Sequence, residues 1–576
     1  MKLVSVRANK EHFRPVEFRD GLNVILAERT DESKDTDSRN GVGKTTLFQI
    51  IDFCLGGRVK SSDGLSKLTG SGWEFELTLE FENESRLAVT RSLDETSDIR
   101  LSGDLVALGL AEKSPTRLGV RGWTSWLGER AFGLNDREIK SEYEPTFRRL
   151  FGHFLRFRAD AYISPFETFG KQPPHQVQVD NAYLMGLNSA LAVEWQRLKD
   201  RDKALGALAK RDVDEIGERL GDLESRRVRV ESNRRRLVEQ IEKFEVLPEY
   251  REVELRANKA TARMQKLANE STMSGRLLDL YREQLASEEP SELEAVIEVF
   301  EEAGVVFGNA LERSLEEIIA FHAQVARNRL DYLRAEVAKL ESIQLERHEE
   351  LMRLEASRRA DLAMLESHGA LEDFAQLQQR VGTAAAEAES LSQQIDELRR
   401  IRAGKAALRV EQVELQQRTA LDIEERLDSV AAVLEDFSET FESLYGEPAD
   451  LVIDSGPAGY QFRVALPRQG SHGVGKVGVF AYDIAVANVW AKRQAGPGFL
   501  AHDSIIFDGV YERQVASAIR RAKDFADQLG YQYILTVNSD DLPAEQLDAY
   551  GVGVADVVVI TLTDTDAAGG LLGVRV

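Results

Sequence analysis

Residues 37–46 read Asp-Ser-Arg-Asn-Gly-Val-Gly-Lys-Thr-Thr, and the rest of the chain is organised around them. An apolar run, Leu22–Leu26, comes before this stretch and a second, Leu47–Leu55, comes after it, which predicts a strand, a loop and a helix. The core from Asn40 to Thr45 matches the second half of a phosphate-binding P-loop. Its glycines let backbone N–H groups approach phosphate oxygens, and the helix directs its positive end there. A glycine-rich turn with a chance lysine is the plain alternative, but the flanking elements are the context that the motif requires.

The motif gives a role to each residue that would bind nucleotide. The predicted nucleotide-binding residues are Asn40, Gly41, Val42, Gly43, Lys44, Thr45 and Thr46. Lys44 would reach the β- and γ-phosphates, and the Thr45 hydroxyl would bind Mg²⁺. The full motif has glycine five residues before Gly43, where this chain has Ser38. The preceding segment, residues 27–37, is long and acidic, and it is either a mobile lid or a solvated surface insertion.

Composition restricts the class of protein. The chain has 576 residues, of which 30% are charged, and its formal net charge is −24. A wholly acidic chain is a poor non-specific DNA coat, so any contact with nucleic acid needs a local basic patch. The lone cysteine, Cys54, excludes an internal disulfide framework and favours a reducing compartment. Met1–Val6 lacks a signal-peptide pattern and no apolar run is long enough to span a membrane, so we expect a cytoplasmic protein.

Changes in composition and periodicity along the sequence predict three parts. Residues 1–186 read as α/β, with alternating strands such as Glu74–Phe81 and a helical, aromatic-rich stretch at 120–160. Residues 187–445 hold only two prolines, Pro248 and Pro290, and are rich in Glu, Arg, Leu and Ala. Residues 446–576 return to α/β. In this last part we expect strands at 451–453, 461–465, 498–503, 533–537 and 557–562, an amphipathic helix at 477–490 and a second helix at 514–529.

Apolar residues of the middle part recur at heptad spacing. One run alternates steps of three and four residues without a break: Phe374, Leu377, Val381, Ala384, Ala388, Leu391, Ile395 and Leu398. This pattern predicts a coiled coil; a globular helical bundle is the alternative, but its helices would seldom run so long. Breaks near 248, 290–308 and 367–369 indicate a long, antiparallel, interrupted arm with its farthest point near 290–308. A second fold-back near Gly369 stays open.

Two α/β parts joined by a coiled coil predict a split head. The arrangement resembles the SMC/RecN class of ABC ATPases, in which the Walker A motif is N-terminal while the signature and Walker B motifs are C-terminal. The resemblance covers the whole architecture and is most specific at residues 40–46. It implies an α/β P-loop NTPase head of the ABC type with a long inserted antiparallel α-helical coiled-coil arm. It also implies ATP and Mg²⁺ as ligands and a homodimer formed through the heads.

The resemblance also implies a catalytic set near the C-terminus. Phe499–Asp503 looks like a Walker B strand, so Asp503 would order Mg²⁺ together with Thr45. The glutamate that usually follows is replaced by Ser504, whose hydroxyl is a poor general base without help. Asp508 looks like a D-loop acid and is our preferred substitute base. Glu512 and His502 are the other candidates, and a helix or turn cap is the alternative role for Asp508.

Three further elements of the ABC pattern can be placed. Residues 470–476, Gly-Ser-His-Gly-Val-Gly-Lys, resemble a degenerate signature, which would bring Ser471, Gly473, Gly475 and Lys476 to the nucleotide of the opposing subunit. A flexible glycine-rich loop is the alternative. Asn538 stands where the switch histidine is usual, and asparagine can bind a phosphate or water but cannot shuttle a proton. Residues 161–167 are the expected Q-loop.

A narrower resemblance is carried by segments 35–44, 52–56, 321–329, 480–483 and 502–509. They look like the SMC-like ABC ATPases of bacterial three-component anti-phage systems, long labelled a domain of unknown function. This implies an ATP-driven sensor encoded beside a small middle component and an effector. The departures at Ser504 and Asn538 predict that its basal hydrolysis is slow. No nuclease, deaminase or protease constellation occurs in the sequence, so the effector would be another protein. A DNA-repair or chromosome-organising ATPase is the first alternative, and a structural coiled coil that binds nucleotide without turnover is the second.

Basic clusters are the candidates for DNA contact. One lies in the head and interleaves with phenylalanines: Arg148, Arg149, His153, Arg156 and Arg158. Two lie in the arm, at residues 226–236 and 399–409. Each could contact DNA phosphates, whereas pairing with glutamates across a coiled coil or simple solvation is the plain alternative. We expect the head cluster to be the weakest of the three candidates.

Overall fold

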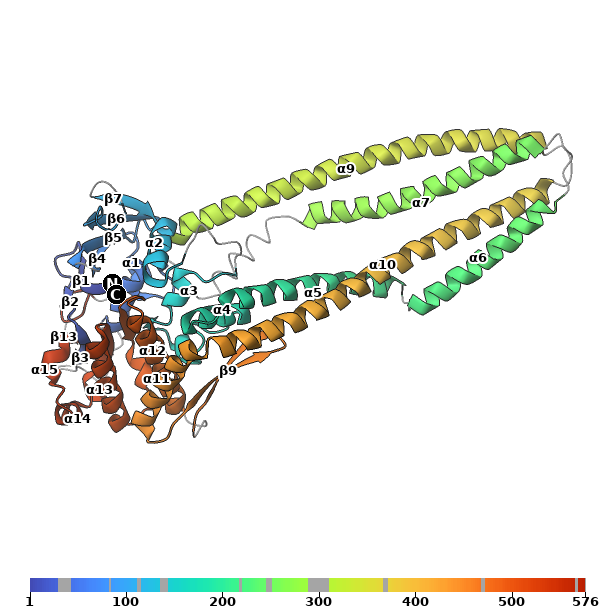
Figure 1. Ribbon diagram of the computed structural model, residues 1–576. Helices are drawn as coiled ribbons and strands as arrows, with labels where there is room; N and C mark the ends of the chain where they lie inside the picture. Colours follow the sequence, from blue (N-terminus) through green and yellow to red (C-terminus); the bar gives the residue numbers. More distant parts are fainter. Residues whose placement is uncertain are drawn as a thin grey trace. The chain divides into compact units, whose positions relative to one another are not determined.

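The computed structural model describes residues 1–28, 43–81, 84–110, 115–134, 143–216, 220–244, 251–287, 310–365, 371–467, 472–564 and 568–574. Contacts divide the chain into two units, drawn together in Figure 1. The head comprises Met1–Arg197, Gln412–Val576 and the first turns of α9 (Ala310–Leu365). The arm comprises Leu198–Glu294 and His322–Glu411. Both ends of the sequence therefore build the head.

A five-stranded sheet forms the centre of the head. Its order is β13 (Val558–Thr563), β3 (Gly21–Glu28), β12 (Gln532–Asn538), β11 (Phe499–His502) and β8 (Leu155–Arg156), and all neighbours run parallel. The residues of β3, β11 and β12 are almost all buried, as expected for parallel strands covered on both faces. The N-terminal strand β3 lies between two strands from the C-terminal end of the chain. The head is therefore split in sequence but continuous in space.

A second sheet has six antiparallel strands. Its order is β2 (Val16–Glu17), β1 (Lys2–Ala8), β4 (Glu74–Glu80), β5 (Arg86–Ser92), β6 (Asp98–Gly103) and β7 (Thr116–Gly119). The predicted alternation of β4 is confirmed, because every second side chain is buried. Helix α1 (Lys44–Cys54) packs against β4, and the Cys54 thiol lies beside the Phe75 carbonyl. Burial raises the pKa of that thiol to about 12, which fits the packing role expected for it.

The remaining head elements are mostly helical. They are α2 (Val120–Phe132), α3 (Phe147–Phe151), α4 (Pro174–Met185), α11 (Leu427–Tyr445), α12 (His472–Lys492), α13 (Glu512–Leu529), α14 (Ala544–Ala549), α15 (Val554–Val557), and the hairpin of β9 (Asp450–Gly456) and β10 (Gly459–Ala465). The helical prediction for 120–160 is wrong at its end, because Leu155–Arg156 is the edge strand β8. Two residues are too few to leave a periodic signal in the sequence.

Helix α12 runs through the head core. All of its residues from Val477 to Trp490 are buried, so the predicted amphipathic character is wrong. The reason is that α11, α13 and α4 all pack against it. Among the described residues it is the one helix that is long and apolar enough to cross a membrane by composition, and 83% of that apolar window is buried inside the protein. Such burial is typical of the core helix of a globular domain.

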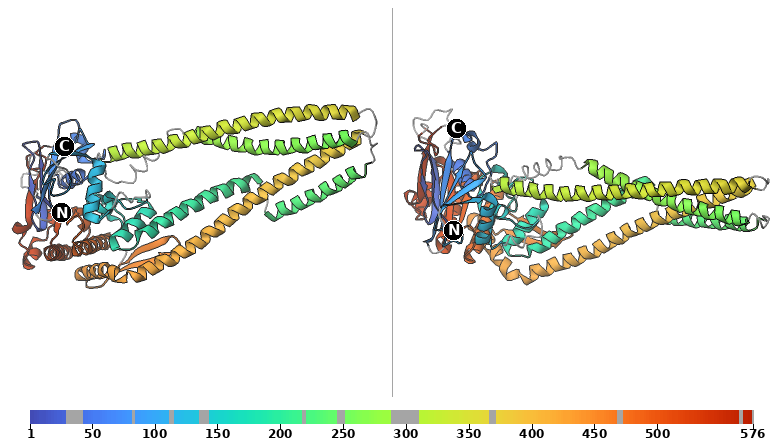
Figure 2. Two further views of the ribbon diagram at one scale, coloured as in Figure 1. Left: turned by 45° about the horizontal axis from the view of Figure 1, so that its top comes forward. Right: turned by 90° about the horizontal axis from the view of Figure 1, so that it is seen from above.

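The arm consists of paired helices α5 (Ser189–Ile216), α6 (Leu220–Glu242), α7 (Arg251–Ser287), α9 and α10 (Leu371–Glu425). Ion pairs between α6 and α10, such as Arg226 with Glu387, and between α7 and α9, such as Arg263 with Glu350, define two antiparallel pairs. Figure 2 shows both pairs. The predicted heptad seam is the buried face of α10, where Leu391 and Ile395 pack against Leu223 of α6.

The side-chain contacts also give the direction of each helix. Phe244, just after α6, meets Phe374 near the start of α10. Four residues further along α10, the Gln378 side chain donates to the Asn258 side chain of α7. Arg256 near the start of α7 pairs with Asp361 near the end of α9. The chain therefore reverses between α6 and α7 and again between α9 and α10, at the same end of the arm. The predicted farthest point, near 290–308, lies outside the described residues.

The roots of the arm belong to the head. Trp195 of α5 donates its indole N–H to Thr419 of α10, and the Asp422 carboxylate accepts from the Tyr460 hydroxyl at 2.7 Å and from the Asn188 N–H at 2.9 Å. These bonds tie both arm helices to the β9–β10 hairpin. They explain why contacts place the boundary at 197 and 412, inside the region 187–445 that sequence texture assigns to the arm.

Candidate nucleotide-binding site

Three adjacent strands deliver the central residues of the site. Lys44 and Thr45 begin α1, while Asp503 and Asn538 lie at the carboxyl ends of β11 and β12. Gly43 directly before α1 has φ of 103°, and a Cβ there would lie 2.6 Å from the Leu571 Cβ. Only glycine fits that position, because the backbone is left-handed and the space is closed. The carboxyl edge of a parallel α/β sheet is where ligands usually bind.

The structure joins the predicted P-loop residues to the predicted Walker B and switch residues. The Thr45 hydroxyl donates to Asp503 Oδ2 at 2.9 Å, across 458 residues of sequence. Lys44 Nζ donates to Asn538 Oδ1, and Asn538 Nδ2 in turn donates to Asp541 Oδ2 at 2.6 Å. Lys44 is 6% exposed and Asp503 is 3% exposed, so their charges lie at a desolvated edge of the sheet. Four sequence-predicted residues therefore form one cluster.

The Asp503 carboxylate is held by several donors. The Ser504 hydroxyl lies 3.3 Å and the Ile505 N–H 3.4 Å from Oδ1, while Thr45 holds Oδ2. Burial raises the pKa of Asp503 above its usual range, although these donors and the charge of Lys44 oppose that shift. A nearby cation would relieve the desolvation cost of the charged form. The site therefore favours the arrival of a positive charge next to Asp503.

The donor set fits Mg²⁺ of the P-loop type. Mg²⁺ takes oxygen ligands and usually keeps several waters, with one or two protein groups and the phosphates completing its shell. Thr45 and Asp503 supply one hydroxyl and one carboxylate at adjoining positions. In the described part of the chain, no group of three or more His, Cys, Asp or Glu residues could hold a metal by itself. Any Mg²⁺ at this edge would need phosphate and water ligands as well as the protein.

The candidate general bases occupy different positions. His502 is fully buried, with Nε2 3.1 Å from Asp483 Oδ2 and Nδ1 3.1 Å from the Tyr533 hydroxyl. Both ring nitrogens are engaged, so this histidine has no nitrogen directed at an attacking water. Ser504 is bonded to Asp503 rather than to a base. Asp508 and Glu512 are exposed, just after β11 and in the first turn of α13.

The segment that we predict to be a degenerate signature packs against the D-loop candidate. Lys476 Nζ lies 3.0 Å from Asp508 Oδ2. A Cβ on Gly473 would lie 2.2 Å from the Gly509 carbonyl oxygen, so the first turn of α12 touches the backbone of the 508–510 loop. Gly475 is exposed and nothing lies within 4 Å of its Cβ direction. Gly473 therefore serves close packing, while Gly475 faces outward.

Some predicted residues lie elsewhere or outside the described ranges. Asn40, Gly41, Val42 and Ser471 fall outside the described residues. Thr46 is half-buried in the first turn of α1. The head cluster of arginines is turned inward: Arg148 pairs with Asp52 in the interior, and Arg149 pairs with Asp180 at 2.6 Å. Those two arginines are buried and neutralised, so they present no basic surface to DNA.

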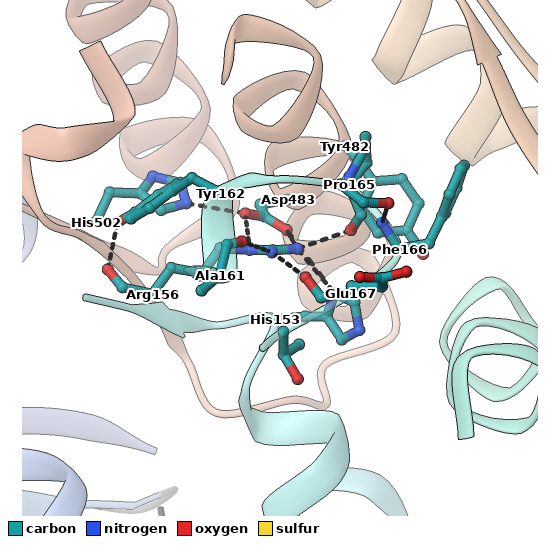
Figure 3. Close-up of polar contacts among 12 residues, drawn as sticks. His153, Arg156, Ala161, Tyr162, Pro165, Phe166, Glu167, Tyr482, Asp483 and His502 are labelled. Carbon is teal, nitrogen blue, oxygen red and sulfur yellow. Dashed lines mark hydrogen bonds and ion pairs between the residues drawn. The ribbon is translucent and has the colours of Figure 1, made fainter. Parts of the chain in front are cut away.

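A buried polar cluster beside the site was missed by sequence reasoning (Figure 3). Arg156 of β8 forms an ion pair with Asp483 of α12, with Nε 2.6 Å from Oδ2, and both side chains are fully buried. The same guanidinium donates to the carbonyls of Ala161, Pro165 and Glu167. The expected Q-loop segment is thereby folded around one arginine. The aromatic-rich context of Arg156 gave no signal for this role, because its partner is 327 residues away.

Two histidines adjoin this cluster. Arg156 Nη2 lies 3.1 Å from His153 Nδ1, and burial together with the charge of Arg156 lowers the pKa of His153 well below its usual range. Burial also lowers the pKa of His502, against the opposing effect of Asp483. A neutral His502 that donates Nε2–H to Asp483 accepts the Tyr533 hydroxyl at Nδ1. The only buried charges at the centre of the cluster are then Arg156 and Asp483.

Comparisons with known proteins give a partial match. A family model described as "Uncharacterised protein conserved in bacteria (DUF2326)" matches residues 440–576, and no curated protein matches the chain. Structural neighbours are Smc head domains with coiled coil. One neighbour is the Smc head domain with a coiled coil and joint from Pyrococcus yayanosii. Its sequence is 14% identical, the match covers 98% of this chain and 94% of the neighbour's chain, and the TM-score is 0.34.

A second neighbour is the Smc head domain with an extended coiled coil bound to the C-terminal domain of ScpA, from Pyrococcus furiosus. Its sequence is 11% identical, the match covers 94% of this chain and 90% of the neighbour's chain, and the TM-score is 0.31. Similarity at this level assigns no function, so the roles of individual residues rest on the geometry of the site.

Proposed function

We propose that this protein is an SMC-like ABC ATPase that binds ATP with Mg²⁺ and dimerises through its heads. The observation that carries the proposal is the convergence of Lys44, Thr45, Asp503 and Asn538 at one edge of the parallel sheet. The lysine would meet the phosphates, and the hydroxyl and carboxylate would hold Mg²⁺. These are the groups that phosphoryl transfer requires, because its catalysis is mainly positioning and charge stabilisation.

The same site supports a slow enzyme. Ser504 is bonded to Asp503 and Asn538 to Lys44, so neither residue acts as a strong base where the ABC pattern has glutamate and histidine. Loss of a positioned general base costs about 10²–10⁴ in rate. A long-lived ATP-bound dimer suits a sensor that waits for a trigger. We therefore propose that the ATPase regulates an effector, together with a small middle component, in a bacterial anti-phage system.

Substitution of Lys44 tests the nucleotide site. Lys44→Ala should weaken ATP binding by about 10- to 150-fold, because a hydrogen bond to a charged group contributes about 1.5–3 kcal/mol. Lys67→Ala, an exposed lysine of the same head, is the matched control and should bind ATP normally. Titration with a fluorescent ATP analogue measures both. Unchanged affinity in Lys44→Ala would remove the basis of the proposal.

Assembly and turnover separate the alternatives. Light scattering at several protein concentrations should show a larger dimer fraction with ATP and Mg²⁺ than without them. Steady-state phosphate release distinguishes an ATPase from a structural coiled coil that only binds nucleotide. Co-purification with the product of a neighbouring gene would support the sensor role. Tight DNA binding by the chain alone would favour a chromosome-organising ATPase, although several arm arginines, among them Arg226 and Arg399, already pair with glutamates.

A further inference from the structure

The buried Arg156–Asp483 cluster joins four separate elements of the head (Figure 3). Arg156 belongs to β8, Asp483 to α12 and His502 to β11, while the three carbonyl acceptors belong to the 161–167 segment. Tyr162 closes the cluster, because its hydroxyl donates to the Arg156 carbonyl and lies 3.0 Å from the N–H of Asp503. The four side chains, those of Arg156, Tyr162, Asp483 and His502, are all buried. The cluster thus ends at the residue that adjoins Thr45.

Packing alone does not account for such a cluster. Replacing a buried ion pair by apolar side chains of similar volume is often neutral or stabilising, so the pair is weak evidence of a contribution to stability. Directed hydrogen bonds instead fix the positions of the joined elements relative to one another. Arg156 donates to three carbonyls and one carboxylate, so a shift of α12 against β8 would leave a buried charge unpaired. The elements must move together or not at all.

The position of α12 indicates which surfaces a rigid cluster would connect. Its first turn carries Gly473 and Lys476, which pack on the 508–510 loop, and Asp483 lies two turns further along the same helix. The other end of the cluster is the backbone of Asp503. The 161–167 loop, whose carbonyls accept from Arg156, carries Ile163, which is 72% exposed. A change at Asp503 would therefore reach an exposed surface through buried polar groups.

We propose that Arg156, Asp483, His502 and Tyr162 form a positioning relay that couples the nucleotide site to the first turn of α12 and the 161–167 loop. The relay rests on the proposed ATP-dependent head dimer. None of its members acts on the reacting atoms. Because coupling between two binding events is reciprocal, ATP would strengthen head association and head association would strengthen ATP binding by the same factor. Cutting the relay removes this factor and spares the binding of ATP to the isolated head.

The test compares two buried ion pairs. Asp483→Asn and Arg156→Lys cut the relay. Asp180→Asn alters a second buried pair, between Arg149 and Asp180, which has no bond to α12 in the described residues. Tyr162→Phe removes a single hydroxyl and provides a relay variant that should fold even where the charge variants do not. ATP affinity at low protein concentration, the dimer association constant with and without ATP, and amide hydrogen exchange of residues 161–167 are measured on the full chain.

Asp483→Asn and Arg156→Lys should keep ATP affinity within about threefold and lose at least about tenfold of the ATP-dependent gain in dimer association, since typical coupling is 5–150-fold. Exchange in 161–167 should rise in both, and Tyr162→Phe should show a smaller loss. Unchanged coupling in all three variants, or an equal loss in Asp180→Asn, would overturn the relay. If the unaltered protein binds no ATP, the proposed function fails and the relay fails with it. If the unaltered protein binds ATP and associates more strongly with ATP, but the relay variants keep that full gain, the relay alone fails.

Discussion

Replacing Thr45 by valine removes the contact on which the Mg²⁺ assignment depends. Valine keeps the branched shape, so the first turn of α1 should be retained with a propensity change of only a few tenths of a kcal/mol. The hydroxyl donates to Asp503 Oδ2 at 2.9 Å, where the aspartate is 3% exposed. Without nucleotide, the loss of this donor should cost about 1–3 kcal/mol, the usual penalty for a buried group left unsatisfied.

The effect on nucleotide should depend on the metal. A hydrogen bond to a charged group contributes about 1.5–3 kcal/mol, and the loss of the Thr45 ligand should cost a similar amount. That corresponds to about a 10- to 150-fold weaker affinity for Mg²⁺–ATP. In EDTA the metal is absent, so Thr45→Val and the unaltered protein should bind ATP equally well. Comparing the loss of ATP affinity in Mg²⁺ with the loss in EDTA therefore separates the loss of a metal ligand from general damage to the loop.

The assay is a titration with a fluorescent ATP analogue, with Mg²⁺ and with EDTA, supported by thermal unfolding of each variant. Thr45→Ser keeps the hydroxyl and is the matched control, expected to bind within about threefold of the unaltered protein. Equal Mg²⁺–ATP affinity in Thr45→Val and Thr45→Ser would refute the assignment. So would a loss in Thr45→Val that is as large in EDTA as in Mg²⁺.

Three further predictions follow from the same geometry. Asp508→Asn should stop phosphate release and spare ATP binding; full turnover would show that Asp508 is not the base. Gly473→Ala places a Cβ 2.2 Å from the Gly509 carbonyl oxygen and should cost about 1–3 kcal/mol in unfolding free energy while weakening the dimer, whereas Gly475→Ala, which meets no atom within 4 Å, should be neutral by denaturant titration. Burial raises the pKa of Asp503, so its stabilising contribution is present below the unfolded pKa and is lost as pH rises through the folded value. Asp503→Asn should therefore raise the melting temperature at pH 8 more than at pH 5, and a lower melting temperature at pH 8 would contradict this.

Local sequence patterns predicted those elements in which apolar residues recur with a strong period. The alternation of Glu74–Phe81 and the heptads of 374–398 both correspond to buried faces in the structure. Lys44 and Thr45 of the predicted P-loop, the acid that follows β11 and the polar residue that ends β12 also meet at one edge, because parallel strands present their carboxyl ends together. In each case a few adjacent residues contain the information. Long-range partners were not needed to recognise them.

Features that depend on distant partners could not be predicted in this way. Arg156 lies among phenylalanines and arginines, and nothing near it in sequence indicates that Asp483 neutralises it in the core. Helix α12 was expected to have a polar face, but the three helices around it bury every side. The path of the arm depends on which helix pairs with which, and both α6–α10 and α7–α9 pairings satisfy the same heptad pattern.

The position of β3 explains why the two parts of the head, which the arm separates in sequence, must fold together. β3 hydrogen-bonds to β12 on one side and β13 on the other, so the candidate nucleotide-binding edge exists only after the two ends of the chain have met. The entropic cost of closing a loop rises slowly with its length, and paired helices reduce it further by restricting the intervening chain. The bonds of Trp195 to Thr419 and of Asp422 to Tyr460 hold that closure at the head itself. These bonds fix the roots of α5 and α10 to each other and to the β9–β10 hairpin of the head, while the pairing of β3 with β12 and β13 brings Lys44 to the edge where Asp503 lies.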